Sequence, residues 1–344
     1  MKNRFLRLIA LMLMAVLLPG CAWREAAAGQ RRYEASFLTL FDTVTTIVGY
    51  ADSEESFRAQ SQSIHDNLLE YHQLFDIYHT YPGMNNLKTI NDNAGKEPVQ
   101  TDRRLIAMLL VCRELYEQTD GRVNAAMGSV LSLWHEARTA GIDDPEHAAL
   151  PDREALQDAA AHMDFDDVII DEEASTVYLR DPALQLDVGA IAKGYAVGEV
   201  CRNAPAGMLV SVGGNVCATG RKPDGSAWVV GVQDPDGADR YLHTLQITEG
   251  AVVTSGDYQR YYTVDGVRYH HIIDPETLMP AESWRCVTVL CADSGIADGL
   301  STALFLLSRE AGQALLEQYG AEAMWVTEDG EELFSPGFQE FIRS

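Results

Sequence analysis

The chain has 344 residues, of which 51 are Asp or Glu and 26 are Lys or Arg, and its formal net charge at pH 7 is −25. This balance excludes a nucleic-acid-binding surface, which requires a basic stripe, and it excludes adsorption of the protein body to anionic lipids. The length is sufficient for one large domain or two modest ones, each with a buried core.

The N-terminal segment has the pattern of a targeting signal. Basic residues within the first seven positions are followed by the apolar run Leu8–Leu18, which is too short to cross a membrane and is typical of a signal-peptide core. The next residues, Pro19-Gly20-Cys21, are similar to a bacterial lipoprotein cleavage site. We therefore predict a signal peptide over 1–20, lipidation of Cys21, and an extracytoplasmic protein anchored to the cell membrane. A plain secretory signal is the alternative.

The remaining cysteines do not form a recognisable framework. They lie at Cys112, Cys201, Cys217, Cys286 and Cys291, with no C-x-x-C pair and no zinc-ligand spacing. We expect Cys112 in an apolar core, and the last two on opposite faces of one strand. The odd number of thiols argues against a disulfide scaffold.

A small, polar tether is expected over 21–35, before a single functional domain over 36–344. Residues 36–50 are rich in β-branched and aromatic residues, which indicates strands. A helix should begin at Asp52, because Glu55 three positions later completes the pattern of a capping box. The polar stretch from 78 to 97 is too long for a simple connector and is a candidate binding loop.

The rest of the domain mixes strands, hairpins and helices. Apolar residues at a 3.6-residue period predict a helix that is capped by Thr101 or Asp102 and ended by Gly121, and Pro151 begins another. Strands are expected over 166–171, 175–180, 184–187, 208–212, 227–233, 241–247, 250–254 and 284–291. Helices are expected from the 188–193 region to 203, over 296–307 and over 309–319. Hairpin turns are expected at 265–266 and 329–330. This order favours an α+β fold, with mixed or antiparallel sheets flanked by helices, over a doubly wound parallel sheet.

The segment from 186 to 195 predicts a strand-to-helix corner. Gly189 and Ala190 leave the backbone open to a ligand, and Asp187 and Lys193 place one charge of each sign beside it. This composition suits an anionic ligand, with or without a metal. The lysine precedes a glycine, so the segment is not a Walker A loop. A tight turn into an ordinary helix is the alternative.

Two further segments carry residues that suit ligand contact. Gly213 and Gly214 allow close backbone approach, and Asn215 can hydrogen-bond a ligand, although an ordinary turn would use the same residues. His270 and His271 are adjacent on a predicted strand, so only one of them can face a given site. An imidazole there suits proton transfer or phosphate contact, and half-exposed strand histidines are the alternative.

The fourth segment begins an apolar helix at Ala297. Asp298 and Thr302 are four residues apart, so they share one helix face. Their carboxylate and hydroxyl oxygens are hard ligands of the kind that Mg²⁺ prefers. An acid that stabilises the helix N-terminus is the alternative. Together the four segments suit Mg²⁺-assisted chemistry on a phosphoanhydride.

These motifs, in this order, resemble the ApbE family of FAD:protein FMN transferases, from Phe41-Asp42-Thr43 to the helix of Asp298 and Thr302. The resemblance implies an ApbE-like, T-fold-related architecture and an exported, often lipid-anchored enzyme. It implies Mg²⁺-dependent transfer of FMN from FAD to a Thr or Ser hydroxyl of a target flavoprotein, through a phosphoester bond and with release of AMP. Some members instead hydrolyse FAD to FMN and AMP.

The resemblance also implies roles for individual residues. Mg²⁺ would be held by Asp298, Thr302 and the main-chain carbonyl of Ala190, and His271 would assist the transfer together with Asp298. The candidate FAD-binding residues are Phe41, Tyr78, Arg122, Val123, Asn124, Asp187, Lys193, Gly213, Gly214, Asn215 and His271.

The chain departs from the family pattern at two places. Asn124 replaces an Asp that many members have, and Leu278 follows Thr277 where the usual residue is Gly. The second departure puts the role of His271 in question, because it changes the turn behind that residue. The proton of the incoming hydroxyl would pass to His271 or to a carboxylate. Hydrolysis of FAD, or flavin binding without turnover, are the competing functions, and the bulk of Tyr78 favours transfer because it would exclude water.

Overall fold

The computed structural model describes residues 29–343, so the predicted signal peptide and Cys21 lie outside the described residues. The first strand, β1 (Arg31–Leu40), begins inside the range that we assigned to the tether. Among residues 29–343 no helix has both the length and the apolar character that spanning a bilayer requires.

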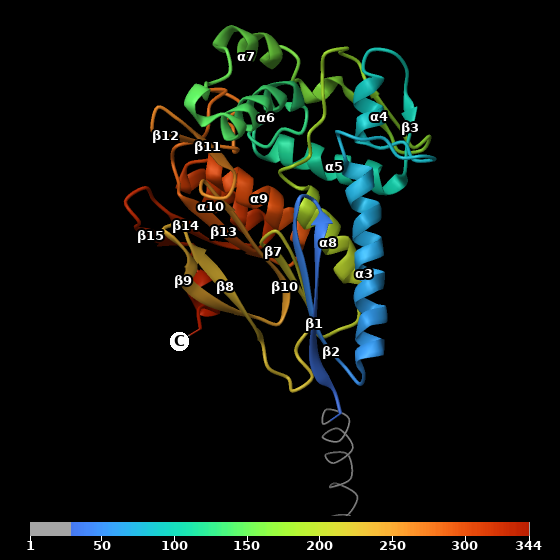
Figure 1. The fold of residues 1–344 in the computed structure, drawn as a ribbon, viewed down its shortest axis with the longest axis vertical. Coiled ribbons are helices and arrows are strands. Elements are labelled where there is room, and N and C mark those ends of the chain that lie inside the picture. The colour runs from blue at the N-terminus through green and yellow to red at the C-terminus, as the bar shows by residue number, and fades with distance from the viewer. Residues whose placement is uncertain (1–28, 344) are drawn as a thin grey trace, which may run out of the picture.

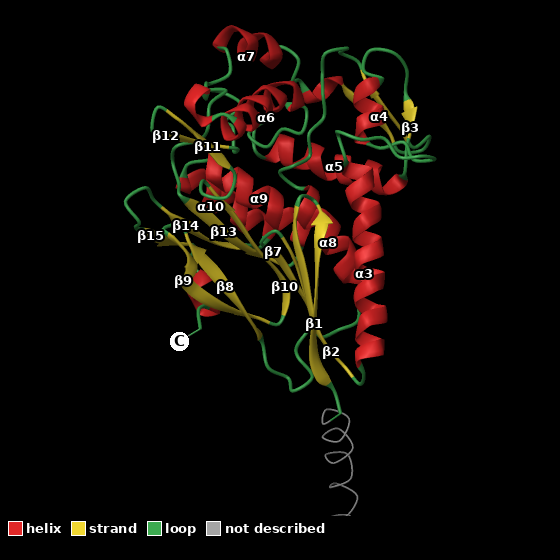
Figure 2. Cartoon of the chain, in the orientation of Figure 1, coloured by secondary structure: helices red, strands yellow, loops and turns green. Residues whose placement is uncertain are grey.

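An eight-stranded sheet forms the centre of the molecule, with strand order β1-β2-β6-β7-β10-β13-β14-β15 and every neighbouring pair antiparallel. The other strands of this sheet are β2 (Thr43–Ala51), β6 (Met208–Val212), β7 (Asn215–Thr219), β10 (Glu249–Gly256), β13 (Cys286–Cys291), β14 (Glu322–Val326) and β15 (Glu332–Phe334). Figure 2 shows helices set against this sheet, which confirms the predicted α+β class.

Helices cover one face of the sheet and a two-stranded ribbon covers the other. The helices are α3 (Glu54–Phe75), α8 (Ala192–Asn203), α9 (Ser294–Leu306) and α10 (Arg309–Tyr319), and the ribbon pairs β8 (Trp228–Asp234) with β9 (Gly237–Ile247). Along β13, Val287 packs on the helical side and Cys286 on the ribbon side. Because both faces of this strand are covered, its sequence is apolar almost without interruption.

A second, smaller layer lies beyond the end of the sheet (Figure 1). It contains α4 (Leu87–Asp92), α5 (Arg103–Gln118), α6 (Gly128–Asp143), α7 (Arg153–Ala160), the three-stranded sheet β3 (Val99–Gln100), β5 (Thr176–Leu179) and β4 (Val168–Asp171), and the hairpin β11 (Tyr261–Val264) with β12 (Val267–His270). Short 3₁₀ turns lie at Pro145–His147, Phe165–Asp167 and Phe338–Phe341. Trp134 and Tyr262 are buried where α6 packs on the hairpin.

Local signals predicted several element ends. Asp102 caps α5 through a bond from the Arg104 N–H, and Gly320 ends α10 in the left-handed conformation, at φ 59°. The cap of α3 is Ser53, one residue after the predicted Asp52, because the Ser53 hydroxyl accepts the Ser56 N–H. All five cysteines within the described part of the chain are free thiols.

The predicted strand over 184–187 is wrong. This segment is extended, but its main partner is a side chain: Asn91 accepts the Leu186 N–H and donates to the Leu186 carbonyl. Its next residue, Asp187, donates its N–H to the Ala125 carbonyl. The run has the apolar residues of a strand, but no continuous neighbouring strand reaches it. Asn91 comes from α4, a short helix inside the stretch that we predicted to be a binding loop.

Candidate functional site

Two helices, α8 and α9, meet at a junction where the start of α8 is hydrogen-bonded to a side chain of α9. The Gly194 N–H at the start of α8 donates to Oδ2 of Asp298 on α9, at 2.8 Å. Ile191, at the N-cap position of α8, offers no side-chain oxygen, so Asp298 does the work of a cap from a different helix. A Cβ on Gly194 would overlap both Asp298 and the Ser294 carbonyl. The glycine is therefore required for this close approach.

One backbone oxygen at this junction is free. Gly194 is the third residue of α8, so its N–H is one of the N-terminal donors that have no acceptor within the helix. The Ala190 carbonyl, just before α8, accepts no hydrogen bond from any residue in the 29–343 range. Asp298 is 4% exposed, and Thr302 lies one turn further along α9 and is half-buried. The junction thus carries the three oxygen groups that were predicted as metal ligands: the Asp298 carboxylate, the Thr302 hydroxyl and the Ala190 carbonyl.

The Asp298 carboxylate has positive and polar neighbours. Lys193 Nζ lies 3.7 Å from Asp298 Oδ2 and 3.5 Å from the Gly189 carbonyl. Burial raises the pKa of Asp298, and Lys193, the Gly194 N–H and Asn215 act in the opposite direction. Asn215 is 2% exposed, yet its amide Nδ2 has no partner at hydrogen-bonding geometry among the described residues. A buried amide of this kind is available to a ligand.

Two sharp turns lie side by side at the edge of this junction. Phe41 and Asp42, both at φ 53°, join β1 to β2, and Gly213 and Gly214 join β6 to β7. A Cβ on Gly213 would come within 2.7 Å of the Thr43 hydroxyl, so that glycine is needed for packing. Nothing lies within 4 Å of the corresponding position on Gly214, so its backbone is open to a ligand.

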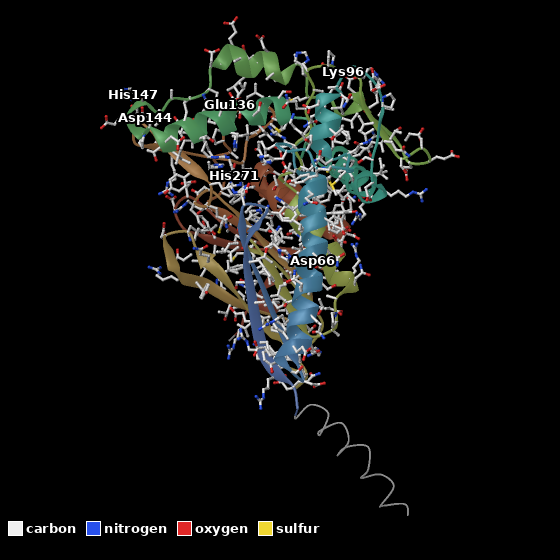
Figure 3. All side chains as sticks on the ribbon, turned by 45° about the vertical axis from the view of Figure 1, so that its right-hand side comes forward. Asp66, Lys96, Glu136, Asp144, His147 and His271 are labelled. Atoms are coloured by element: carbon white, nitrogen blue, oxygen red, sulfur yellow. The ribbon has the colours of Figure 1, made fainter. Side chains whose placement is uncertain are left out.

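The two adjacent histidines have different environments. His270 is fully engaged: Nε2 bonds the Ala281 carbonyl at 2.6 Å and Nδ1 accepts the Ile272 N–H at 3.2 Å. His271 has a buried Nδ1 with no partner among the described residues, and Figure 3 shows it between the α6 layer and the main sheet. Burial, assisted by the positive charge of Arg260, lowers the pKa of His271 to about 3. The imidazole is therefore neutral at physiological pH.

A cationic cluster faces Asp187 across the site. The Tyr78 ring lies 5.4 Å from the ring of His135, and the Arg138 guanidinium donates to His135 Nδ1 at 2.9 Å. Burial raises the pKa of Asp187, and the Gly189 N–H together with the neighbouring basic side chains of His135, Arg260 and Arg138 acts against that rise. Tyr78 is 53% exposed, so its ring is accessible. Sequence reasoning missed His135, Arg138 and Arg260, because none of them belongs to a motif.

Arg122 lies away from the junction and supports the turn behind His271. Its guanidinium lies 3.1 Å from both carboxylate oxygens of Asp274 and 2.7 Å from Glu276. In the same turn Leu278 has φ 60°, the left-handed region that a Gly would enter without strain. The turn keeps this conformation because the Trp134 indole N–H donates to the Leu278 carbonyl.

The next two predicted FAD contacts are also occupied within the protein. The Asn124 amide donates to the Met163 carbonyl and its oxygen accepts the Ala126 N–H. Val123 is 5% exposed and packs in the core. Their side chains therefore organise the loop, and only its backbone would be available to a ligand. Among the predicted contacts, residues 41, 78, 187, 193, 213–215, 271 and 298 remain candidates for contact with a ligand through their side chains or turns.

Among the described residues, no group of three or more His, Cys, Asp or Glu side chains is arranged to hold a metal ion. The donor set at the α8–α9 junction is of a different kind, since it has one carboxylate, one hydroxyl and one main-chain carbonyl. Mg²⁺ commonly takes few protein ligands and completes its octahedron with water and substrate phosphate.

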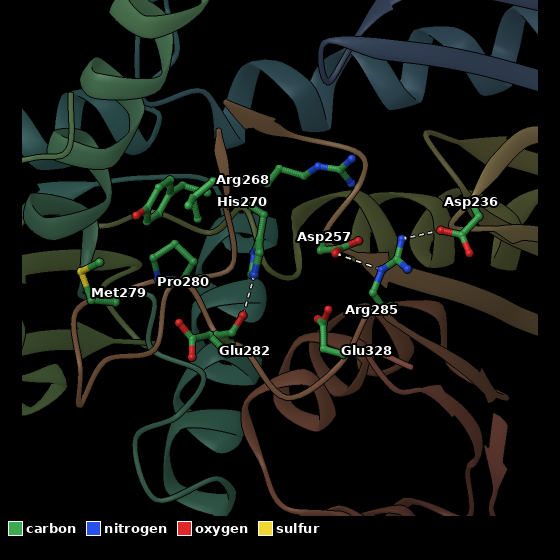
Figure 4. Close-up of a pocket in the computed structure, with 12 residues that line it drawn as sticks. Asp236, Asp257, Arg268, His270, Met279, Pro280, Glu282, Arg285 and Glu328 are labelled. Atoms are coloured by element: carbon green, nitrogen blue, oxygen red, sulfur yellow. Dashed lines mark hydrogen bonds and ion pairs between the residues drawn. The ribbon is translucent and has the colours of Figure 1, made fainter. Parts of the chain in front are cut away.

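A separate cavity of about 720 Å³ opens on the side of the β11–β12 hairpin that faces away from His271 (Figure 4). His270 and Arg268 line it, whereas none of the residues predicted from the sequence to bind FAD or metal does. Arg285 crosses it and lies 3.0 Å from Asp236 and 3.3 Å from Asp257. Arg285 and His270 in this cavity therefore have their partners within the protein.

Comparisons with known proteins identify the family of this chain. Residues 41–325 match the model of the ApbE family. The FAD:protein FMN transferase of Treponema pallidum is 35% identical over 277 residues, which cover 75% of this chain and 75% of that protein. The crystal structure of the ApbE protein from Thermotoga maritima superposes with a TM-score of 0.81 at 31% identity, covering 91% of this chain and all of that one. The flavin transferase ApbE from Vibrio cholerae gives a TM-score of 0.74 at 26% identity, covering 91% of this chain and 99% of that one. The chain belongs to the ApbE family.

Proposed function

We propose that this protein is an FAD:protein FMN transferase, which moves FMN from FAD to the hydroxyl of a Thr or Ser on an acceptor flavoprotein and releases AMP. The family membership and the names of its relatives support the activity. The observation that carries the proposal is the α8–α9 junction, where a buried Asp298, the adjacent Lys193 and the free Ala190 carbonyl meet.

The donor set of the junction fits Mg²⁺. Asp298, Thr302 and the Ala190 carbonyl would hold the ion, and the buried Asn215 amide would have a partner once phosphate oxygens lie beside it. Mg²⁺, when bound, would neutralise charge on the phosphoanhydride oxygens. Lys193 adds a positive charge at the same place and opposes the rise in the pKa of Asp298 that burial causes.

The reaction joins the acceptor oxygen to the FMN phosphorus and breaks the phosphorus–oxygen bond to AMP, and the hydroxyl proton passes to a base. His271 is neutral and has a free Nδ1, so it is able to accept that proton. Negative charge on bound FAD would raise the pKa of the imidazole toward its ordinary range. Asp187 is the carboxylate alternative at the site, and its raised pKa also favours proton transfer.

The flavin and the adenine need flat, accessible surfaces. Tyr78 offers a half-exposed ring, and the turns at Phe41 and Gly214 offer backbone that a ligand can approach. Tyr78 stands over the site together with His135 and would limit the entry of water. This arrangement favours transfer over hydrolysis, which is the second candidate function.

The direct test is to incubate the purified protein with FAD, Mg²⁺ and candidate acceptor proteins from the same cell. Covalent flavin is read as fluorescence on a denaturing gel, and AMP is measured in parallel. We expect AMP only when an acceptor is present, and a fluorescent band at the acceptor. AMP without an acceptor would support the hydrolase, and FAD binding without any AMP would support a flavin-binding lipoprotein.

We also propose that the mature protein is lipid-anchored through Cys21 on the outer side of the cell membrane. The basic, apolar and cysteine-ended N-terminal segment supports this location. A single acyl chain binds membranes weakly, so stable attachment needs more than one chain. Cys21→Ala should move the protein from the membrane fraction to the soluble fraction. Membrane association that is unchanged in this variant would refute the anchor.

A further inference from the structure

Arg138 is a partly buried cation that lacks an acidic partner. It lies on α6, is half-buried, and donates to the neutral acceptor His135. No carboxylate oxygen of the described residues lies within 4.0 Å of its guanidinium. Burial lowers the pKa of Arg138, and the charge of Arg260 lowers it further. A charge that is removed from water without a partner is costly, so the position favours an external anion.

Arg260 adds a second unpaired guanidinium. It lies just before β11, is exposed, and likewise has no carboxylate oxygen within 4.0 Å among residues 29–343. Eight of the 18 arginines among residues 29–343 have a carboxylate oxygen within 4.0 Å. Arg104, for example, lies 2.8 Å from Asp102 and 2.6 Å from Glu70. Most of the others are exposed to water, so Arg138 is distinctive because it is half-buried, and the packing of α6 on β11 brings Arg260 to the same place.

The groups that face this pair do not neutralise it. Asp187 interacts electrostatically with both arginines but lies beyond 4.0 Å from them, and its Oδ1 already accepts the Gly189 N–H. His271 is uncharged, and the positive charges of Lys193 and of the two arginines all lower its pKa. The site therefore has two cationic positions around His271: Lys193 at the α8–α9 junction, and the arginine pair beside α6 and the hairpin.

We propose that Arg138 and Arg260 form an anion site for the adenylate phosphate of FAD, which they hold as it leaves as AMP. The inference rests on the proposed function. FAD has two phosphates, and the junction of Asp298 and Lys193 accounts for one of them. When the phosphorus–oxygen bond breaks, negative charge grows on the departing AMP phosphate. A guanidinium pair suits this phosphate because its planar donors bond two oxygens at once.

The test compares phosphate-bearing and phosphate-free ligands. We would prepare Arg138→Gln, Arg260→Gln and the double variant, with Arg268→Gln as the matched control. Arg268 is an exposed arginine of the same hairpin whose guanidinium lies over the Tyr261 ring, 4.5 Å from its centroid. Affinities for AMP, FAD and riboflavin are measured by calorimetry in EDTA, so the readout needs neither metal nor turnover.

We expect each single variant to bind AMP and FAD about tenfold more weakly, as for the loss of one charge-assisted contact, and to bind riboflavin as the wild type does. The Arg268→Gln control should keep all three affinities, and Arg138→Lys should recover part of the AMP affinity.

Unchanged AMP affinity in the double variant would overturn the proposal, and so would an equal loss for riboflavin, which would indicate a damaged flavin pocket. A loss of acceptor affinity with unchanged AMP affinity would assign the pair to the acceptor instead, and would also overturn it. Because AMP binding is measured without turnover, a wild-type protein that binds AMP but transfers no FMN would refute the proposed function separately.

Discussion

The two sides of the β11–β12 hairpin use the same residue types differently. In the cavity of Figure 4, Arg285 lies against two carboxylates and both nitrogens of His270 are bonded. On the other side, His271 has an unpartnered Nδ1 and Arg138 has no acidic partner among the described residues. His270 is the last residue of β12 and His271 follows it, so the two histidines do not share the strand as the sequence predicted, and the end of the strand separates the two environments.

This difference separates stabilising groups from functional ones. A paired buried group stabilises the fold, whereas an unpaired one costs stability and persists where a ligand will use it. The helix starts show the same contrast. Asp293 caps its own helix, α9, while the α8 start depends on Asp298 from a neighbouring helix. The following predictions test whether paired and unpaired groups divide in this way.

The largest effect is expected from Asp298→Ala. It removes the carboxylate that the Gly194 N–H and Lys193 contact, so FMN transfer in Mg²⁺ should fall at least about 100-fold, as for other groups that stabilise transition-state charge. The control is Asp293→Ala, which removes the α9 cap and an exposed ion pair with Arg202, and should cost about 1 kcal/mol of stability without a comparable loss of activity. Transfer at the wild-type rate by Asp298→Ala would contradict the metal assignment.

Gly194→Ala should disturb the same junction through packing. The added methyl would overlap Asp298 and the Ser294 carbonyl, so we expect a loss of about 1–3 kcal/mol in urea unfolding, with a fall in transfer activity. Gly198→Ala, one turn along α8, is the matched control because its nearest neighbour would be at an ordinary 3.4 Å. Equal effects of the two substitutions would show that the Gly194 contact is not special.

Arg285→Gln should affect stability and leave ligand binding unchanged. It removes the partner of Asp257, whose side chain is only 15% exposed, so we expect a loss of about 1–3 kcal/mol in the free energy of unfolding. FAD affinity should stay at the wild-type value, the reverse of the expectation for Arg138→Gln. If both substitutions weakened FAD binding to the same degree, the contrast between the two sides would fail.

The last effect concerns pH and builds up only gradually as the pH falls. The pKa of His271 is about 3 in the folded protein and near 6.5 in a free chain, so below pH 6.5 the unfolded chain binds a proton that the folded one does not. Stability should therefore fall as the pH drops from about 6.5 toward 3, by at most about 1.4 kcal/mol per pH unit. Urea unfolding of the wild type and of His271→Gln measures this slope. Identical slopes for the wild type and His271→Gln would indicate that the His271 imidazole is in contact with water.

Much of the local structure could be predicted from neighbouring residues. Asp102 and Gly320 define helix ends, and Asp265-Gly266 forms a hairpin turn at φ 51° and 82°. Asp298 and Thr302 share a helix face because a fixed period links them. These features depend on dihedral preferences and short-range hydrogen bonds, which follow from the types of residues that are neighbours in the sequence.

Contacts between distant residues depended on the path of the chain. Asn91 replaces a neighbouring strand at Leu186, 95 residues away, and the Gly194 N–H finds Asp298 across 104 residues. No periodicity encodes such pairs, because each requires the packing of elements that are far apart in the sequence. The sequence by itself determined the helix ends, the hairpins and the chemical types at the site. Only the tertiary structure decided which polar groups are paired and which remain free, since that depends on what the fold brings beside them.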